Sequence, residues 1–275
     1  MNKSVSILGC GWLGVPLAEH FMSLGYAVKG STTQADKLSL LKQKGIDAYV
    51  IDLSKEAAIT TEFFKSDLLI VMVPPRSRTQ QPGVYLSQMK KLAKQIIQHP
   101  HIKQFIYTSS TSVYPDRAGL AKEEQVCSAE QSAHAELVEV ENLFLSISDL
   151  AVTIVRLGGL TGGSRLLVKH FAGKKDLAGG NYPVNLLHQE DAVRILHFVA
   201  EKRLTGVMNA CSPKHPFKKI FYRELAQRFQ MALPEFREEQ EEGKTIDVSK
   251  LQNEGYIFSF EDPHTFAYDQ DLNTA

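Results

Sequence analysis

The chain has 275 residues, 43% of them hydrophobic, so it can bury a substantial core in one or two domains without disulfide or metal support. Its 31 basic and 31 acidic residues cancel, which argues against a general nucleic-acid binder or a membrane-surface binder. None of the three cysteines lies in a CxxC pair and the nine histidines lack metal-ligand spacing, so we expect reduced thiols and no metal site. The sequence also has no leader-like or membrane-spanning apolar stretch, so we expect a cytoplasmic protein.

Short apolar runs alternate with amphipathic stretches along most of the chain. Seven runs, several of them apolar almost throughout, predict buried strands at Val5–Leu8, Tyr26–Gly30, Asp47–Ile51, Leu68–Val73, Gln104–Thr108, Ala151–Leu157 and Val207–Ala210. Four stretches between them repeat apolar residues at helical spacing, starting at Leu13, Leu86, Leu137 and Ala192. This alternation predicts a doubly wound parallel sheet of the Rossmann type, an α/β fold.

The first strand runs into a GxGxxG motif, Gly9-Cys10-Gly11-Trp12-Leu13-Gly14, which opens a helix. In this setting Gly9 permits a tight turn, Gly11 lets a pyrophosphate approach the backbone, and Gly14 lets helix and strand pack closely. The helix N-terminus offers N–H groups and a partial positive charge to phosphate. The motif predicts a dinucleotide site that includes Trp12 and Leu13, and a glycine-rich turn that binds nothing is the alternative.

The residues after the second strand bear on which dinucleotide binds. NAD enzymes usually place Asp or Glu there for the ribose hydroxyls. This chain has Ser31, Thr32 and Thr33, and Lys37 follows shortly after. Hydroxyls and a lysine suit a 2′-phosphate, so we predict NADP, with NAD as the alternative cofactor. The same three residues could instead cap the next helix.

The pattern loosens after about residue 158, where glycine pairs interrupt the chain. We therefore expect a dinucleotide-binding Rossmann domain over residues 1–157, completed by segments near 184–210. A smaller substrate-binding lobe is expected over residues 158–183 and 211–275.

Several later segments resemble the extended short-chain dehydrogenase/reductases, the superfamily of NAD-dependent epimerases and dehydratases. The strand ending in Thr108-Ser109-Ser110, with Val113-Tyr114 three residues on, carries this resemblance. Arg156 to Gly162 resembles the loop at that family's substrate cleft, and His188 to Asp191 resembles its His-x-x-Asp helix start. The Gly-Trp-Leu-Gly opening and the segment from Cys211 to Pro216 look like the YeeZ-like group of atypical members.

The resemblance implies roles for matching positions. Thr108 and Ser109 would line the nicotinamide side of the cofactor, and Ser110 would take the position of the catalytic serine or threonine. Val73, Pro74 and Pro75 would take the place of the loop at the end of the fourth strand and lie beside the cofactor.

One departure from the family pattern concerns catalysis. The usual proton-transfer pair is Tyr-x-x-x-Lys, and none of the nine tyrosines is followed four residues later by lysine. Tyr114, His134 and His188 are candidate substitutes, because each falls near the expected cleft. Each has a plainer interpretation: a packing tyrosine, a histidine on a helix surface, and a histidine that orients a helix start.

We expect an NADP-dependent oxidoreductase or epimerase that acts on a polar small molecule, for example a nucleotide-linked one. Ser110, Tyr114 and His134 are the candidate catalytic residues, and Arg156 and His188 are candidates for substrate binding. The alternative is an NAD(P)-binding sensor or regulatory protein without turnover. A homodimer through the helices near 84–98 and 130–148 is a further expectation, although packing against their own sheet explains their apolar stripes equally well.

Overall fold

The computed structural model describes residues 3–55, 59–75, 81–116, 119–125, 128–132, 134–238 and 243–269, and Cys127 lies outside them. The chain forms two compact units. Unit 1 comprises residues 1–109, 134–155 and 193–207, and unit 2 comprises residues 110–133, 156–192 and 208–275.

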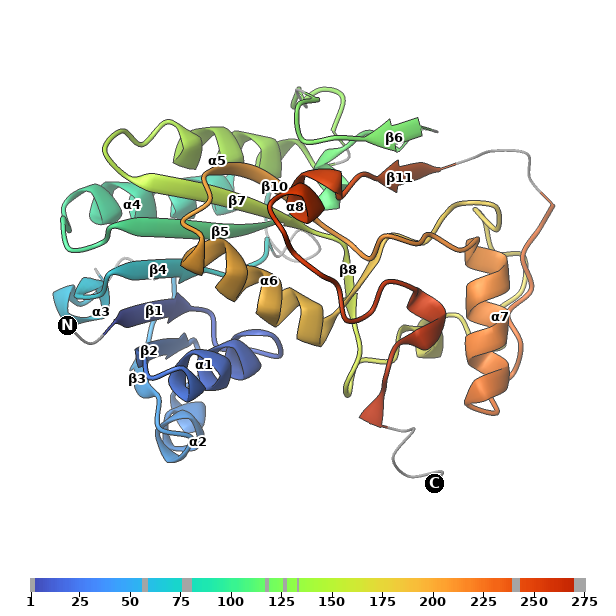
Figure 1. Cartoon of the computed structure of the whole chain (residues 1–275), viewed down its shortest axis with the longest axis horizontal. Coiled ribbons are helices and arrows are strands. Elements are labelled where there is room, and N and C mark those ends of the chain that lie inside the picture. The colour runs from blue at the N-terminus through green and yellow to red at the C-terminus, as the bar shows by residue number, and fades with distance from the viewer. Residues whose placement is uncertain are drawn as a thin grey trace. The chain divides into compact units, whose positions relative to one another are not determined.

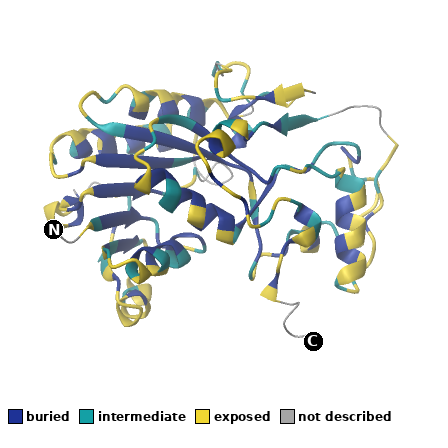
Figure 2. Ribbon diagram, in the orientation of Figure 1, coloured by how far each residue is buried: buried dark blue, intermediate teal, exposed yellow. Residues whose placement is uncertain are grey.

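Seven strands form a parallel sheet in the order β10-β7-β5-β4-β1-β2-β3, and their buried side chains make up much of the core (Figures 1 and 2). They are β1 (Ser4–Leu8), β2 (Ala27–Thr32), β3 (Asp47–Val50), β4 (Leu68–Val71), β5 (Gln104–Ser110), β7 (Ala151–Leu157) and β10 (Gly206–Ala210). The chain winds outward from β1 to β3 and then returns to β4, on the other side of β1. Ligands of such folds bind beyond the carboxyl ends of the strands where this reversal occurs, here β1 and β4.

Helices pack on both faces of this sheet. They are α1 (Gly14–Ser23), α2 (Leu38–Gln43), α3 (Thr61–Phe64), α4 (Val84–Ile97), α5 (Ala135–Leu145) and α6 (Gln189–Glu201). Neighbouring residues of β5 point to opposite faces. Gln104 donates from Nε2 to the carbonyl of Val199 in α6 at 3.2 Å, whereas the ring of Phe105 packs on Phe144 of α5. The predicted doubly wound α/β fold is confirmed. None of the described helices has the length and apolar character needed to cross a bilayer.

Unit 2 contains two pairs of short parallel strands and a helical core. β6 (Gly119–Ala121) pairs with β11 (Lys244–Ile246), and β8 (Gly159–Thr161) pairs with β9 (Leu186–His188). Buried side chains of α7 (Lys218–Arg228) pack with Phe266 and Tyr268, and α8 (Ser249–Asn253) follows β11. Residues 110–133, expected in the dinucleotide-binding domain, belong to unit 2, because the pairing of β6 with β11 ties them to the C-terminal segment.

Two histidines meet where α1 contacts α6. The rings of His20 and His197 lie edge to face with centroids 4.9 Å apart. Burial lowers the pKa of His20, and the neighbouring charges of His197 and Arg194 lower it further. Burial also lowers the pKa of His197; Lys3 adds to this, whereas Glu201 opposes it. The folded state therefore disfavours protonation of this pair.

This pair predicts that stability depends on pH. A histidine whose pKa is lowered on folding binds fewer protons in the folded state than in the unfolded state. Above the unfolded pKa of about 6.5 both states leave it neutral, and the folded protein loses stability as pH falls below that value, because the unfolded state then takes up the proton first. We expect the Tm to fall between about pH 7.5 and pH 5.5, and to fall less in the double variant His20→Gln/His197→Gln. The exposed His101→Gln serves as control. Equal Tm changes in the wild type and the double variant would show that the pair does not contribute.

Candidate functional site

The glycine loop joins the end of β1 to the start of α1 in a close-packed turn. Gly9 has a φ of 112°, and a Cβ at Gly14 would lie 2.3 Å from the Gly9 carbonyl oxygen. At Gly11, by contrast, a Cβ would meet no atom within 4 Å. Gly9 and Gly14 are therefore required by the fold itself. The space above Gly11 is what a backbone needs if a phosphate is to approach it.

The start of α1 provides the charge that such a ligand needs. The first N–H groups of a helix have no partner within the helix, and together with the helix dipole they favour an anion. Trp12 is half-buried beside this helix start, and the side chain of Leu13 is buried. The side chain of Leu13 therefore packs in the core, so a predicted contact of this residue with a dinucleotide would be made by its main chain.

Ser31 shapes the glycine loop from the end of β2. Its hydroxyl accepts the Gly9 N–H at 3.0 Å, and its carbonyl accepts the Cys10 N–H at 2.7 Å. Ser31 is only 2% exposed, whereas Thr33 is exposed, and Thr32 accepts the Gln34 N–H. Of the three residues predicted to contact a 2′-phosphate, Ser31 thus orients the loop, and Thr33 is the most accessible.

A pocket opens at this edge of the sheet, within unit 1. It is lined by the ends of β1 to β4: Leu8, Gly9, Ser31, Thr32, Thr33, Ile51, Asp52, Leu53, Ser54, Val73 and Pro74, together with Gln88 of α4. Asp52 and Leu53 were not among the residues predicted from the sequence to lie at the site. The position of Asp52 directly after a predicted strand, at the edge where the glycine loop lies, was the available signal.

The ends of β4 and β5 carry the next predicted residues. The Val73 carbonyl accepts the hydroxyl of Tyr85 at 2.6 Å, Pro74 is exposed, and Pro75 is partly exposed and does not line the pocket. Thr108 donates to the Val71 carbonyl at 3.3 Å, which ties β5 to β4. Ser109 is buried, and its Oγ has no hydrogen-bond partner among the described residues.

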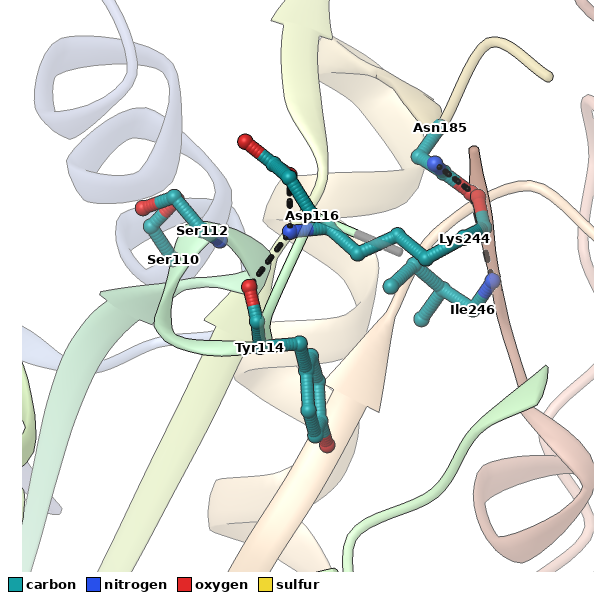
Figure 3. Close-up of polar contacts among 7 residues, drawn as sticks. All are labelled: Ser110, Ser112, Tyr114, Asp116, Asn185, Lys244 and Ile246. Atoms are coloured by element: carbon teal, nitrogen blue, oxygen red, sulfur yellow. Dashed lines mark hydrogen bonds and ion pairs between the residues drawn. The ribbon is translucent and has the colours of Figure 1, made fainter. Parts of the chain in front are cut away.

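Ser110 is partly exposed and begins a single turn of 3₁₀ helix over residues 111–113 (Figure 3). Its Oγ accepts two hydrogen bonds from Ser112, one from the backbone N–H at 3.1 Å and one from the hydroxyl at 2.9 Å. A serine hydroxyl has two acceptor sites and one donor. Both acceptor sites are used, so the Ser110 hydroxyl keeps its proton for donation.

Tyr114 and Arg156 lie together in the interior of unit 2. Tyr114 is 1% exposed and donates its hydroxyl to Asn209 at 2.8 Å, and the Arg156 guanidinium stacks 4.8 Å from the centre of its ring. Burial raises the pKa of Tyr114 to about 12, although Arg156 opposes this shift. Such a tyrosine is poorly suited to proton transfer. Arg156 is itself only 5% exposed, so this arrangement favours packing roles for both residues.

The two candidate histidines lie in different units. His188 is buried, its Nδ1 accepts the Glu190 N–H at 3.3 Å, and its Nε2 pairs with the Ala267 carbonyl at 3.0 Å. Its ring also packs on that of Phe260 in a tilted arrangement, with centroids 3.8 Å apart. These contacts match the plainer interpretation, in which His188 orients a helix start. His134 is exposed just before α5.

Comparison with known proteins agrees with this geometry. Residues 9–185, which include the glycine loop, match the model of a protein family described as NAD(P)H-binding. The chain belongs to this NAD(P)H-binding family. It is also 32% identical to the protein YeeZ of Escherichia coli K12 over 269 residues, which cover 95% of this chain and 97% of YeeZ. The predicted resemblance to YeeZ-like proteins is confirmed.

Solved structures show how widely this fold is shared. A functionally unknown conserved protein from Silicibacter pomeroyi DSS superposes with a TM-score of 0.80 at 16% identity, with 99% of each chain covered. A UDP-glucuronic acid 4-epimerase from Bacillus cereus, solved in complex with NAD, superposes with a TM-score of 0.76, also at 16% identity, with 98% of this chain and 99% of that chain covered. At these identities the likeness establishes the epimerase-type fold of this NAD(P)-binding chain.

The glycine loop provides a matched pair of substitutions. Gly14→Ala places a methyl group against the Gly9 carbonyl, so we expect a lower Tm together with weaker dinucleotide binding. Gly11→Ala meets no protein atom, so we expect an unchanged Tm but affinity for NADPH lowered by about 10-fold or more, because the methyl group occupies the space for the pyrophosphate. Calorimetric titration with NADPH and thermal unfolding measure both effects. Full affinity in Gly11→Ala would place the pyrophosphate elsewhere.

Tyr114→Phe tests whether Tyr114 is structural. The variant leaves the Asn209 side-chain oxygen buried without its hydroxyl donor, so we expect a loss of about 1–3 kcal/mol in the free energy of unfolding. Affinity for the dinucleotide should not change. Chemical denaturation and NADPH titration check these outcomes, and unchanged stability would contradict this interpretation.

Proposed function

We propose that this chain binds NADP in the pocket beside the glycine loop, with the pyrophosphate over Gly11 at the start of α1. The open space above Gly11 supports this placement, because there the backbone can approach a phosphate without obstruction. The pocket continues past the ends of β2 and β3, where Leu53 and Asp52 form a wall suited to an adenine ring. Leu53 would pack on the face of the ring, and a carboxylate suits its amino group.

The 2′-phosphate of NADP would lie at Thr33 and Lys37. Thr33 lines the pocket and is exposed, and Lys37 is exposed at the end of the 3₁₀ turn Ala35–Lys37. The carboxylate that NAD enzymes use for the ribose hydroxyls is replaced at this position by serine and threonine. Ser31 supports the site indirectly, by holding Gly9 in place.

Cofactor preference follows from this placement. We expect tighter binding of NADPH than of NADH. Lys37→Met should weaken NADPH by about 10-fold while leaving NADH unchanged, because only NADPH carries the phosphate. Lys42→Met, at another exposed lysine close by on α2, is the matched control. Equal or tighter binding of NADH by the wild type would overturn the NADP assignment.

We further propose that the chain is an oxidoreductase or epimerase in which Ser110 binds the reacting oxygen of a polar substrate. The observation that supports this role is the pair of hydrogen bonds from Ser112, which leaves the Ser110 hydroxyl as a donor. A donor at that position suits a carbonyl oxygen that gains negative charge as hydride arrives. NADP, when bound, supplies or accepts that hydride.

A second candidate function is a dinucleotide sensor that does not turn over substrate. It is favoured by the lack of a Tyr-x-x-x-Lys pair and by the buried, hydrogen-bonded state of Tyr114. In this alternative, Ser110 and Ser112 serve only to cap the turn that follows β5.

Turnover separates the two functions. In one assay the protein is saturated with NADPH and screened against carbonyl compounds, with oxidation of the cofactor as the readout. In a second assay it is incubated with NADP or NADPH and nucleotide sugars, and the sugar products are analysed. The enzyme predicts turnover that Ser110→Ala lowers by about 100-fold, because the donor to the reacting oxygen is lost. Tight NADPH binding without turnover across the panel would favour the sensor.

A further inference from the structure

The turn that begins at Ser110 is held from a distant part of the chain. Strand β11 is only three residues long and pairs in parallel with β6, with Lys244 opposite Gly119 and Ile246 opposite Ala121. The first residue of β11, Lys244, extends its side chain toward the residues that follow Ser110 (Figure 3).

The ammonium group of Lys244 makes two short contacts at the end of this turn. Nζ donates to the Tyr114 carbonyl at 2.7 Å and to the Asp116 carboxylate at 2.8 Å. The Lys244 side chain is 12% exposed, whereas that of Asp116 is 71% exposed. Hydrogen bonds from a charged donor are about twice as strong as neutral ones. Lys244 therefore fixes the main chain at Tyr114 as well as pairing with a surface carboxylate.

Strand β11 is itself clamped on its other side by one side chain. Asn185 donates from Nδ2 to the Lys244 carbonyl at 2.9 Å and accepts the Ile246 N–H at 3.2 Å on Oδ1. The Asn185 carbonyl in turn accepts the Gly159 N–H at 2.7 Å. Since β11 is bound by both β6 and Asn185, the backbone from which Lys244 projects is well anchored.

These contacts close the Ser110 turn at both ends. At its start, the Ser110 hydroxyl accepts from the backbone and the side chain of Ser112. At its end, the Tyr114 N–H donates to the Thr111 carbonyl at 3.3 Å, and the Tyr114 carbonyl is held by Lys244. A shift of the Tyr114 main chain would pull on the turn and on the donor N–H of Ser112. Ser112 and Lys244 therefore hold the two ends of the same short turn.

We propose that Lys244 is a positioning residue for Ser110, which holds the turn of residues 111–114 so that the Ser110 hydroxyl keeps its orientation toward substrate. This inference rests on the proposed function for its catalytic consequence. Lys244 acts on a backbone carbonyl, four residues past Ser110, from a strand near the C-terminus.

Hydrogen exchange tests, without any substrate, whether Lys244 holds the turn of residues 111–114. In Lys244→Met, exchange of the amides in a peptide over residues 111–116 should accelerate by about 10-fold, while a peptide over residues 104–107 of β5 should not change. Lys214→Met is the matched control, because Lys214 is an exposed lysine of the same unit that pairs with Asp262. Asp116→Ala removes one of the two Nζ partners at an exposed site, and should give a smaller acceleration. Wild-type exchange in both Lys244→Met and Asp116→Ala would overturn the proposal.

Kinetics test the positioning role with any substrate that the panel yields. Lys244→Met should lower kcat by about 10-fold with the KM for NADPH within about twofold, and Lys244→Arg should restore most of the activity. The double variant Lys244→Met/Ser110→Ala should be no slower than Ser110→Ala, because Lys244 acts on catalysis only through Ser110. Additive losses would overturn the positioning role. If no substrate turns over, the proposed enzyme fails, whereas the exchange result still decides whether Lys244 holds the turn.

Discussion

The close approach of Gly14 to the Gly9 carbonyl determines the geometry of the glycine loop, where we propose that the dinucleotide binds. It lets α1 begin directly at the end of β1, so that the start of the helix, with its N–H groups, lies at the carboxyl edge of the sheet. Gly9 also lies against the main chain of Met72 after β4, and the Ser31 hydroxyl at the end of β2 accepts its N–H. The loop is thus formed by three strands together. A larger residue at Gly14 would separate strand, loop and helix at once.

In unit 2, most of the polar side chains predicted to act in catalysis or substrate binding are buried and make structural contacts. Several residues that resemble a catalytic set are employed in packing and in joining distant segments: Tyr114 bonds Asn209, Arg156 stacks on Tyr114, and His188 bonds both Glu190 and Ala267. Ser110 differs, because it is partly exposed and its hydrogen bonds leave a donor to spare. Membership of the NAD(P)H-binding family therefore supports cofactor binding, whereas the proposed chemistry rests mainly on one hydroxyl and on the contacts of the turn that it begins.

Long periodic elements could be predicted from the sequence, and short paired ones could not. Strands β1, β4, β5 and β7 are buried along most of their length because helices cover both faces, and in β4 and most of β7 that burial is visible as an apolar composition. Strands β6, β8, β9 and β11 have three residues each, and each exists because of a partner distant in sequence, so no local pattern reveals them. The contact of Lys244 with the Tyr114 carbonyl likewise joins residues far apart in sequence, so no local pattern predicts it. The glycine loop was visible because its motif is local, whereas the burial of Tyr114, Arg156 and His188 depends on tertiary contacts.

Trp12 is the only tryptophan of the chain and lies within the glycine loop, so its fluorescence reports directly on the proposed site. Titration of the protein with NADPH is the most direct test of dinucleotide binding at this loop. The account predicts saturable quenching of Trp12 emission with energy transfer to the nicotinamide, and a marked loss of both in Gly11→Ala at unchanged Tm. NADPH binding that leaves Trp12 emission unchanged, or no binding at all, would contradict it.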